Sequence, residues 1–119
     1  MAIAAAQAAS SKKAHDVLVL DMREVFILTD YFIICSGNTD RQVGSLMEAV
    51  VKGLAAEGIK KPARREGEQN RRWVLLDYID IVVHIFRAEE REYYEIERLW
   101  KDAPLVEWED EPDEVKASR

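Results

Sequence analysis

The sequence predicts an α/β domain in which a mixed sheet of about five strands is sandwiched by helices. Three observations lead to this class. Apolar runs of strand length occur at 17–21 and 30–37. A segment with apolar residues at helical spacing follows at 39–58, and a hairpin pattern comes after it at 72–86. Strands and helices therefore alternate along the chain.

The length and composition indicate one compact domain. The chain has 119 residues, of which 48% are apolar and 34% are charged, so one hydrophobic core is possible and a second domain is not expected. The formal net charge of −6 disfavours unaided attachment to nucleic acid and favours basic partners. We expect residues 1–105 to form the domain and residues 106–119 to form an acidic, flexible tail, in which only Trp108 can serve as an anchor.

The first half of the chain predicts a short Ala-rich helix at 2–9, buried strands at 17–21 and 30–37, and a long helix. The boundaries within 22–29 stay open. Thr39 and Gln42 form a capping box at the start of the long helix, and Gly58 ends it. The side chains expected to cover the sheet share one helix face: Val43, Leu46, Met47, Val50 and Leu54.

The second half predicts an edge strand at 63–66 and a hairpin with arms at 72–77 and 80–86. Ile79 is a poor residue for a tight turn that requires positive φ, so the turn type is open. Alternation places side chains on two faces of each arm. One face is apolar in the second arm (Ile81, Val83, Ile85), and the other is mixed (Asp80, Val82, His84, Phe86). In the first arm the two sets are Trp73, Leu75 and Asp77, and Val74, Leu76 and Tyr78.

A final helix is expected at about 89–99, where Tyr93, Ile96 and Trp100 lie at helical spacing and should pack inward. Pro104 prevents its continuation.

The residues that could perform chemistry do not form a convincing catalytic set. Ser36-Gly37 lies between a strand and a helix, as in nucleotidyltransferases, but Asp77 and Asp80 lack the spacing that holds a metal pair. Cys35 lies in an apolar run and is expected to be a buried structural thiol, and His84 a surface histidine that forms hydrogen bonds. We therefore expect a protein-binding module that is not an enzyme and has no cofactor or metal.

A basic segment at 60–72 offers a second kind of surface. Its cationic residues are Lys60, Lys61, Arg64, Arg65, Arg71 and Arg72, opposed only by Glu66 and Glu68. Solvated charges on an edge strand explain this pattern, and so does a contact with RNA. The single cysteine and the absence of a run of roughly 18 apolar residues favour a cytoplasmic protein without a membrane segment.

Three segments resemble the Iojap family of ribosomal silencing factors: LVLDMREVFILTDYFIICSGNTDRQV at 18–43, RWVLLDYIDIVVHIF at 72–86 and REYYEIERLWKDAP at 91–104. The resemblance covers about residues 10–105. It implies a fold related to nucleotidyltransferases but without their catalytic acids. It also implies binding to the large ribosomal subunit through its fourteenth protein, a block on joining of the small subunit that represses translation under nutrient limitation, and a homodimer when free.

The same resemblance places the partner-binding surface on the hairpin and the helix after it. The residues are Trp73, Leu76, Asp77, Tyr78, Asp80, Val82 and His84, with Tyr94, Leu99 and Trp100 as support or contact. For Leu76, Leu99 and Trp100 a core position is the better explanation, whereas Trp73, Tyr78 and Asp80 fit a core position and a contact equally well. Ile79 departs from the family pattern, which often has glycine in this turn. The alternatives are a direct RNA-binding assembly factor of the large subunit, with a peripheral ribosomal RNA contact through the basic segment, and a divergent nucleotidyltransferase.

Overall fold

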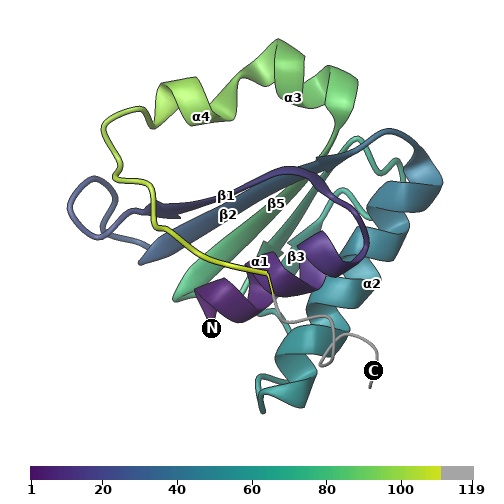
Figure 1. Ribbon diagram of the computed structural model, residues 1–119, viewed down its shortest axis with the longest axis horizontal. Helices are drawn as coiled ribbons and strands as arrows, with labels where there is room; N and C mark the ends of the chain where they lie inside the picture. Colours follow the sequence, from purple (N-terminus) through teal and green to yellow (C-terminus); the bar gives the residue numbers. More distant parts are fainter. Residues whose placement is uncertain (111–119) are drawn as a thin grey trace.

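The computed structural model describes residues 1–110 and has three layers, with a five-stranded sheet between two pairs of helices (Figure 1). The elements are α1 (Ala2–Ser11), β1 (His15–Asp21), β2 (Tyr31–Gly37), α2 (Asp40–Ala56), β3 (Arg64–Glu66), β4 (Trp73–Asp77), β5 (Ile81–Arg87), α3 (Ala88–Tyr94) and α4 (Ile96–Leu99). The predicted α/β class with a mixed five-stranded sheet is confirmed. No helix within the described range is long and apolar enough to span a bilayer.

The strand order is β1-β2-β5-β4-β3. Only β2 and β5 are parallel, and the other neighbouring pairs are antiparallel. The chain leaves β2 through α2 and returns to pair β5 with β2, in the way that parallel strands are joined by a helical crossover. Residues 22–30 form the connection between β1 and β2, which settles the segment 22–29 that the sequence left open.

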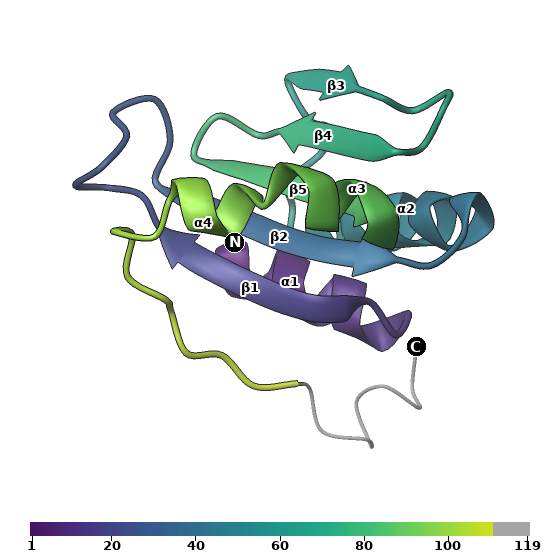
Figure 2. The same ribbon diagram turned by 90° about the horizontal axis from the view of Figure 1, so that it is seen from above.

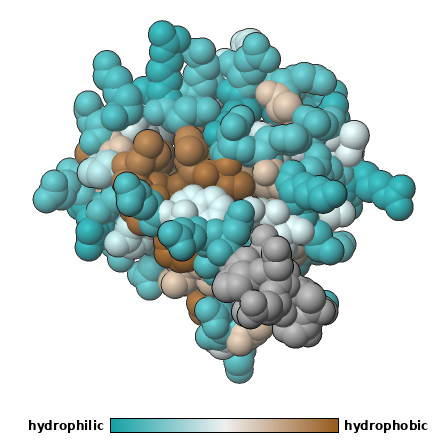
Figure 3. All heavy atoms as spheres, in the orientation of Figure 1, coloured by the Kyte–Doolittle hydropathy of each residue, from teal (hydrophilic) through white to brown (hydrophobic). Residues whose placement is uncertain are grey.

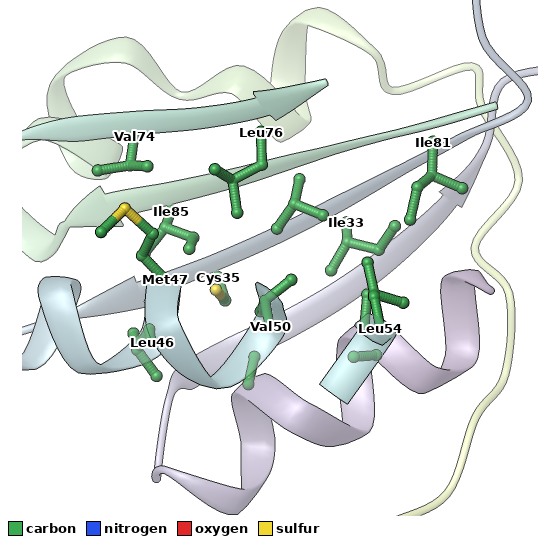
Figure 4. Packing of buried hydrophobic residues seen from close by; sticks show 14 of the residues in the cluster. Ile33, Cys35, Leu46, Met47, Val50, Leu54, Val74, Leu76, Ile81 and Ile85 are labelled. Atoms are coloured by element: carbon green, nitrogen blue, oxygen red, sulfur yellow. The ribbon is translucent and has the colours of Figure 1, made fainter. Parts of the chain in front are cut away.

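The first core lies between the sheet and the helices α1 and α2 (Figure 4). The Thr39 side chain caps α2 as predicted, because its oxygen accepts a hydrogen bond from the Gln42 N–H at 3.0 Å. All five side chains of the predicted apolar stripe are buried. Gly53 lets α1 approach α2 closely, since a Cβ atom there would lie 2.8 Å from the Ala8 methyl group.

The second core lies on the opposite face of the sheet, under α3 and α4. Its buried residues are Leu20, Met22, Phe32, Ile34, Phe86, Ile96 and Ala103. The predicted single helix at 89–99 is wrong, because Glu95 adopts a left-handed conformation with φ of 46° and separates α3 from α4. The break also moves Tyr93 away from the core, where we had expected it, and leaves it exposed.

The segment at 104–109 runs back along the outer edge of β1. The Asp21 N–H donates to the Pro104 carbonyl and the Val106 N–H donates to the Val19 carbonyl, both at 2.8 Å. Trp108 packs against the first core. The segment therefore covers an edge that would otherwise hold unpaired backbone groups. The part of the expected flexible tail at 111–119 lies outside the described residues.

The hairpin turn between β4 and β5 places Ile79 at a φ of 76°. The Asp80 N–H donates to the Tyr78 carbonyl at 2.9 Å, which closes a three-residue γ-turn around Ile79. The Asp77 carboxylate accepts a hydrogen bond from the Ile79 N–H at 2.8 Å and holds the turn. A β-branched residue in this conformation is strained, at a cost of about 1–3 kcal/mol.

Candidate partner-binding surface

The β4–β5 hairpin divides the predicted partner-binding residues between two faces of the sheet. Leu76 and Tyr78 point toward α1 and α2 and are buried in the first core. Trp73 and Val82 point toward the opposite face and are half-buried. The assignment of Leu76 and Tyr78 to a partner surface is therefore corrected, because the strand alternation that exposes Trp73 turns these two side chains into the core.

The prediction that His84 is a surface residue is also wrong, because its side chain is buried. Its exposed fraction is 4%, and its ring packs edge-on against Phe32 with the centroids 4.6 Å apart. The Trp73 indole N–H donates to His84 Nδ1 at 3.1 Å. Since an indole only donates, Nδ1 accepts and the neutral ring holds its proton on Nε2. Burial lowers the pKa of His84 to about 4, so the ring is neutral at physiological pH.

An apolar and aromatic surface remains uncovered beside this histidine. Figure 2 shows that α3 and α4 lie over the middle of the sheet, while β4 and β3 extend beyond them. We call this surface the open face and define it by Trp73, Leu75, Asp77, Val82 and Tyr94. The Tyr94 ring lies 5.1 Å from the Trp73 ring and is half exposed. Half-buried aromatic side chains of this kind can bury large area against a protein.

Two acids lie near the hairpin turn, Asp77 within the open face and Asp80 beside it. The Asp77 carboxylate is partly used inside the protein, because it holds the Ile79 N–H and lies 3.8 Å from the Arg64 guanidinium. Asp80 is exposed, and within residues 1–110 no ion pair involves it. A basic partner can therefore be met by the Asp80 carboxylate without breaking an internal interaction.

The two remaining predicted residues lie at the end of α4. Trp100 is half-buried and packs between Phe26 and Phe32, with ring centroids 5.4 and 5.7 Å away. Its role as a supporting core residue fits these contacts. Leu99, by contrast, is 74% exposed, because the break at Glu95 turns this side of the short helix toward solvent. The alternative explanation of Leu99 as a core residue is therefore wrong.

The basic segment does not form one continuous cationic surface. Arg65 lies 3.6 Å from Glu68, and Arg72 lies 3.5 Å from Glu90. Arg64 is near Glu66 and Asp77. The Arg71 guanidinium lies so close to Gly44 on α2 that a Cβ atom there would collide with it. Lys60 and Lys61 are exposed, and the described residues provide no ion pair for them.

The Ser36-Gly37 turn uses its polar groups internally. The Ser36 hydroxyl accepts from Arg91 Nη1 at 3.3 Å and donates to the His15 carbonyl at 3.4 Å. The buried Arg91 side chain also donates to Glu97 Oε1 at 3.0 Å. These contacts line a hollow of about 680 Å³ with more acidic than basic side chains. The hollow therefore lacks the free positive charge that would attract a triphosphate.

The chemistry-bearing residues in the rest of the protein are dispersed. Cys35 is fully buried in the first core, as predicted, and burial raises the pKa of its thiol to about 12, which suppresses the nucleophilic thiolate. Within residues 1–110, no group of three or more His, Cys, Asp and Glu side chains is placed to hold a metal ion.

Three aliphatic residues with accessible side chains were not among the predicted site residues: Leu75, Ile27 and Leu28. Leu75 was placed on the same side as Trp73 but was not assigned to the site, although the period-two alternation of β4 gave the signal. Ile27 and Leu28 lie in the β1–β2 connection, where no periodicity exists, and both are exposed. Figure 3 shows that apolar atoms also reach the surface on the side viewed in Figure 1.

Comparison with known proteins gives a consistent result. A family model described as "Ribosomal silencing factor during starvation" matches residues 1–119. The Bacillus subtilis protein named "Ribosomal silencing factor RsfS" is 45% identical over 103 residues, which cover 87% of this chain and 86% of that protein.

Two crystal structures share the fold. A Bacillus halodurans protein superposes with a TM-score of 0.75 and 40% identity, covering 87% of this chain and 93% of the other. A Chromobacterium violaceum protein superposes with a TM-score of 0.77 and 34% identity, covering 82% and 80% respectively.

Proposed function

Because this chain belongs to the family of ribosomal silencing factors that act during starvation, we propose that it binds the large ribosomal subunit and blocks joining of the small subunit. The contact is with the subunit's fourteenth protein. Translation falls because the bound domain occupies space that the small subunit needs. Such a mechanism requires no turnover and no cofactor, and it takes place in the cytoplasm.

The observation that supports this proposal is the open face. Trp73, Leu75, Val82 and Tyr94 supply apolar and aromatic area that neither helix layer covers, and Asp77 and Asp80 add negative charge beside it. Protein interfaces combine an aromatic centre with charged groups at the rim in this way. Ribosomal proteins are basic, so the acids on this face favour both the encounter and the orientation of the complex.

The open face also suits a homodimer of the free protein. An apolar surface that is covered only when the partner is bound can be shielded by a second copy in the meantime. In that case the dimer and the ribosomal complex compete. Lys60 and Lys61, which are exposed between α2 and β3, are the part of the basic segment that suits a peripheral contact with ribosomal RNA.

The test is reversal of one charge on the open face. We expect Asp80→Lys to weaken binding to purified large subunits about tenfold, equivalent to about 1.4 kcal/mol, because attraction to a basic protein becomes repulsion. Binding is measured by co-sedimentation with the large subunit, and the block on subunit joining by gradient sedimentation at fixed magnesium concentration.

Glu48→Lys provides the matched control, since Glu48 is an exposed acid on α2, on the opposite layer of the protein. It changes the net charge by the same amount and should leave binding unchanged. An equal loss in both variants would mean that only net charge matters, and the open face would not be the binding surface. Subunit joining that proceeds normally in the presence of saturating wild-type protein would refute the steric mechanism.

A further inference from the structure

Two loops at one end of the sheet present bare aliphatic side chains to solvent. Ile27 and Leu28 belong to the β1–β2 connection and are 96% and 71% exposed, and Ile79 in the β4–β5 turn is 64% exposed. Figure 2 shows both loops at the same end of the molecule, beyond the strands. We call these three residues the aliphatic tip. None of them belongs to either core, so their apolar side chains do not stabilise the fold by burial.

The two loops are fastened to each other by backbone hydrogen bonds. The N–H groups of Asp30 and Tyr31 both donate to the Asp80 carbonyl, at 2.9 and 3.2 Å. The Met22 N–H donates to the Asp30 carbonyl at 2.8 Å and closes the β1–β2 connection at its base. Phe26 inside this connection packs against Trp100. The aliphatic tip is therefore built on a braced base, which lowers the entropy cost of docking.

Ile79 is the residue that folding does not explain. Its γ-turn conformation, with φ of 76°, is one that glycine or asparagine adopts far more easily than a β-branched residue. Backbone strain of this kind is found where the surrounding structure enforces it for function. An exposed isoleucine in a strained turn gains little burial for its side chain within the monomer, so a contact outside the monomer is a physical reason for its presence there.

The charges around the tip select the kind of partner. Glu24, Asp30 and Asp80 are all exposed acids on the same two loops. Within residues 1–110, the one arginine of the β1–β2 connection, Arg23, is engaged by Asp21 at 2.6 Å. Apolar side chains with carboxylates on the same loops are complementary to an apolar recess lined by lysine or arginine.

We propose that the aliphatic tip inserts into an apolar recess of the same basic ribosomal protein that binds the open face, and that Ile79 is retained at the cost of strain for this contact. The inference rests on the proposed function. The tip is continuous with the open face, because Asp77 and Val82 lie on either side of the turn that presents Ile79. The two regions would therefore be covered by one partner.

The decisive test is Ile79→Gly, because the inference predicts opposite signs for stability and binding. Removing the strained side chain should raise the Tm by about 4 °C and weaken binding to large subunits at least tenfold. Ile79→Asn should behave in the same way, since asparagine tolerates positive φ but is polar. The double variant Ile27→Ser with Leu28→Ser should also weaken binding about tenfold, with little change in the Tm.

Lys13→Gly is the matched control for strain relief. Lys13 has a φ of 62° and lies just after α1, at the end of β1 remote from the tip. This variant should raise the Tm but leave binding unchanged. Circular dichroism gives the Tm, and co-sedimentation with large subunits gives the affinity.

If Ile79→Gly binds subunits as tightly as wild type while Asp80→Lys does not, the tip is not a contact and the inference fails, although the proposed function stands. If wild-type protein does not bind large subunits at all, the proposed function fails first. If Ile79→Gly keeps its affinity for subunits but loses self-association in light scattering, the occupant of the tip is a second copy, and the inference is overturned.

Discussion

The two faces of the sheet differ in how completely they are covered. On one face α1 and α2 pack against the inward side chains of β1, β2, β4 and β5, and the residues there are mainly aliphatic and buried. On the other, the broken pair α3 and α4 covers the middle of the sheet and leaves Trp73, Leu75 and Val82 half-buried. Alternate residues of one strand therefore contribute differently. Those on the covered face stabilise the fold, and those on the open face stay accessible to a partner.

The largest expected effect comes from two adjacent leucines in β4. Leu76→Ala removes a fully buried side chain from the first core and should lower the free energy of unfolding by about 3 kcal/mol. Leu75→Ala, one residue away on the open face, should lower it by about 1 kcal/mol or less. Urea denaturation of both variants measures the contrast. Equal losses would mean that the two faces do not differ in the way described.

A pH titration of stability tests the burial of His84, which lies on the face of the sheet under α3 and α4. Burial depresses the pKa of His84 to about 4 from an ordinary value of 6.5, so the folded state prefers the neutral ring. The stability contributed by this preference is complete above pH 6.5 and is lost as the pH falls toward 4, by an amount on the order of 3 kcal/mol. Denaturation midpoints measured across this range should fall accordingly.

His84→Gln is the control for this titration, because glutamine does not ionise. The variant should be less stable than wild type at pH 7 but should lose much less additional stability between pH 6.5 and 4. If stability fell with pH as steeply in His84→Gln as in wild type, other groups would be responsible for the loss. Burial of a neutral His84 would then not explain the pH dependence.

The smallest expected effect concerns how the helices on each face begin. Thr39 caps α2 through its side chain, whereas α3 and α4 have no side-chain cap. Thr39→Ala should therefore lower the free energy of unfolding by about 1 kcal/mol, while Thr39→Ser retains the hydroxyl and should be nearly neutral. Thermal denaturation of the two variants distinguishes them. A similar loss in both would assign the effect to packing of the Thr39 methyl group.

The parts of the fold that could be predicted from sequence are those that depend on local pattern. The cap at Thr39, the apolar stripe of α2 and the alternation in β5 each need only a few neighbouring residues. The break at Glu95 was missed because the spacing of Tyr93, Ile96 and Trp100 suits a continuous helix, and propensity alone does not reveal a left-handed residue between them.

The site was harder to predict because exposure depends on what packs over a strand. The alternation separated His84 from Ile81 and Val83 within the second arm correctly, but the burial of His84 depends on contacts with Phe32 and Trp73, which belong to other strands. The alternative placement of Leu99 in the core was wrong for the same reason. Ile27 and Leu28 could not be selected, since a loop has no periodicity from which exposure can be read.

The segment at 104–109 has a consequence for how the protein behaves when it is abundant. This segment pairs with β1 at Val19 and Asp21, and the strand at the opposite edge of the sheet, β3, is three residues long and bears Arg64, Arg65 and Glu66. A short, charged edge strand offers few backbone groups with which a strand of another copy could pair. Copies of the protein at high concentration can thus stay dispersed instead of polymerising into fibrils.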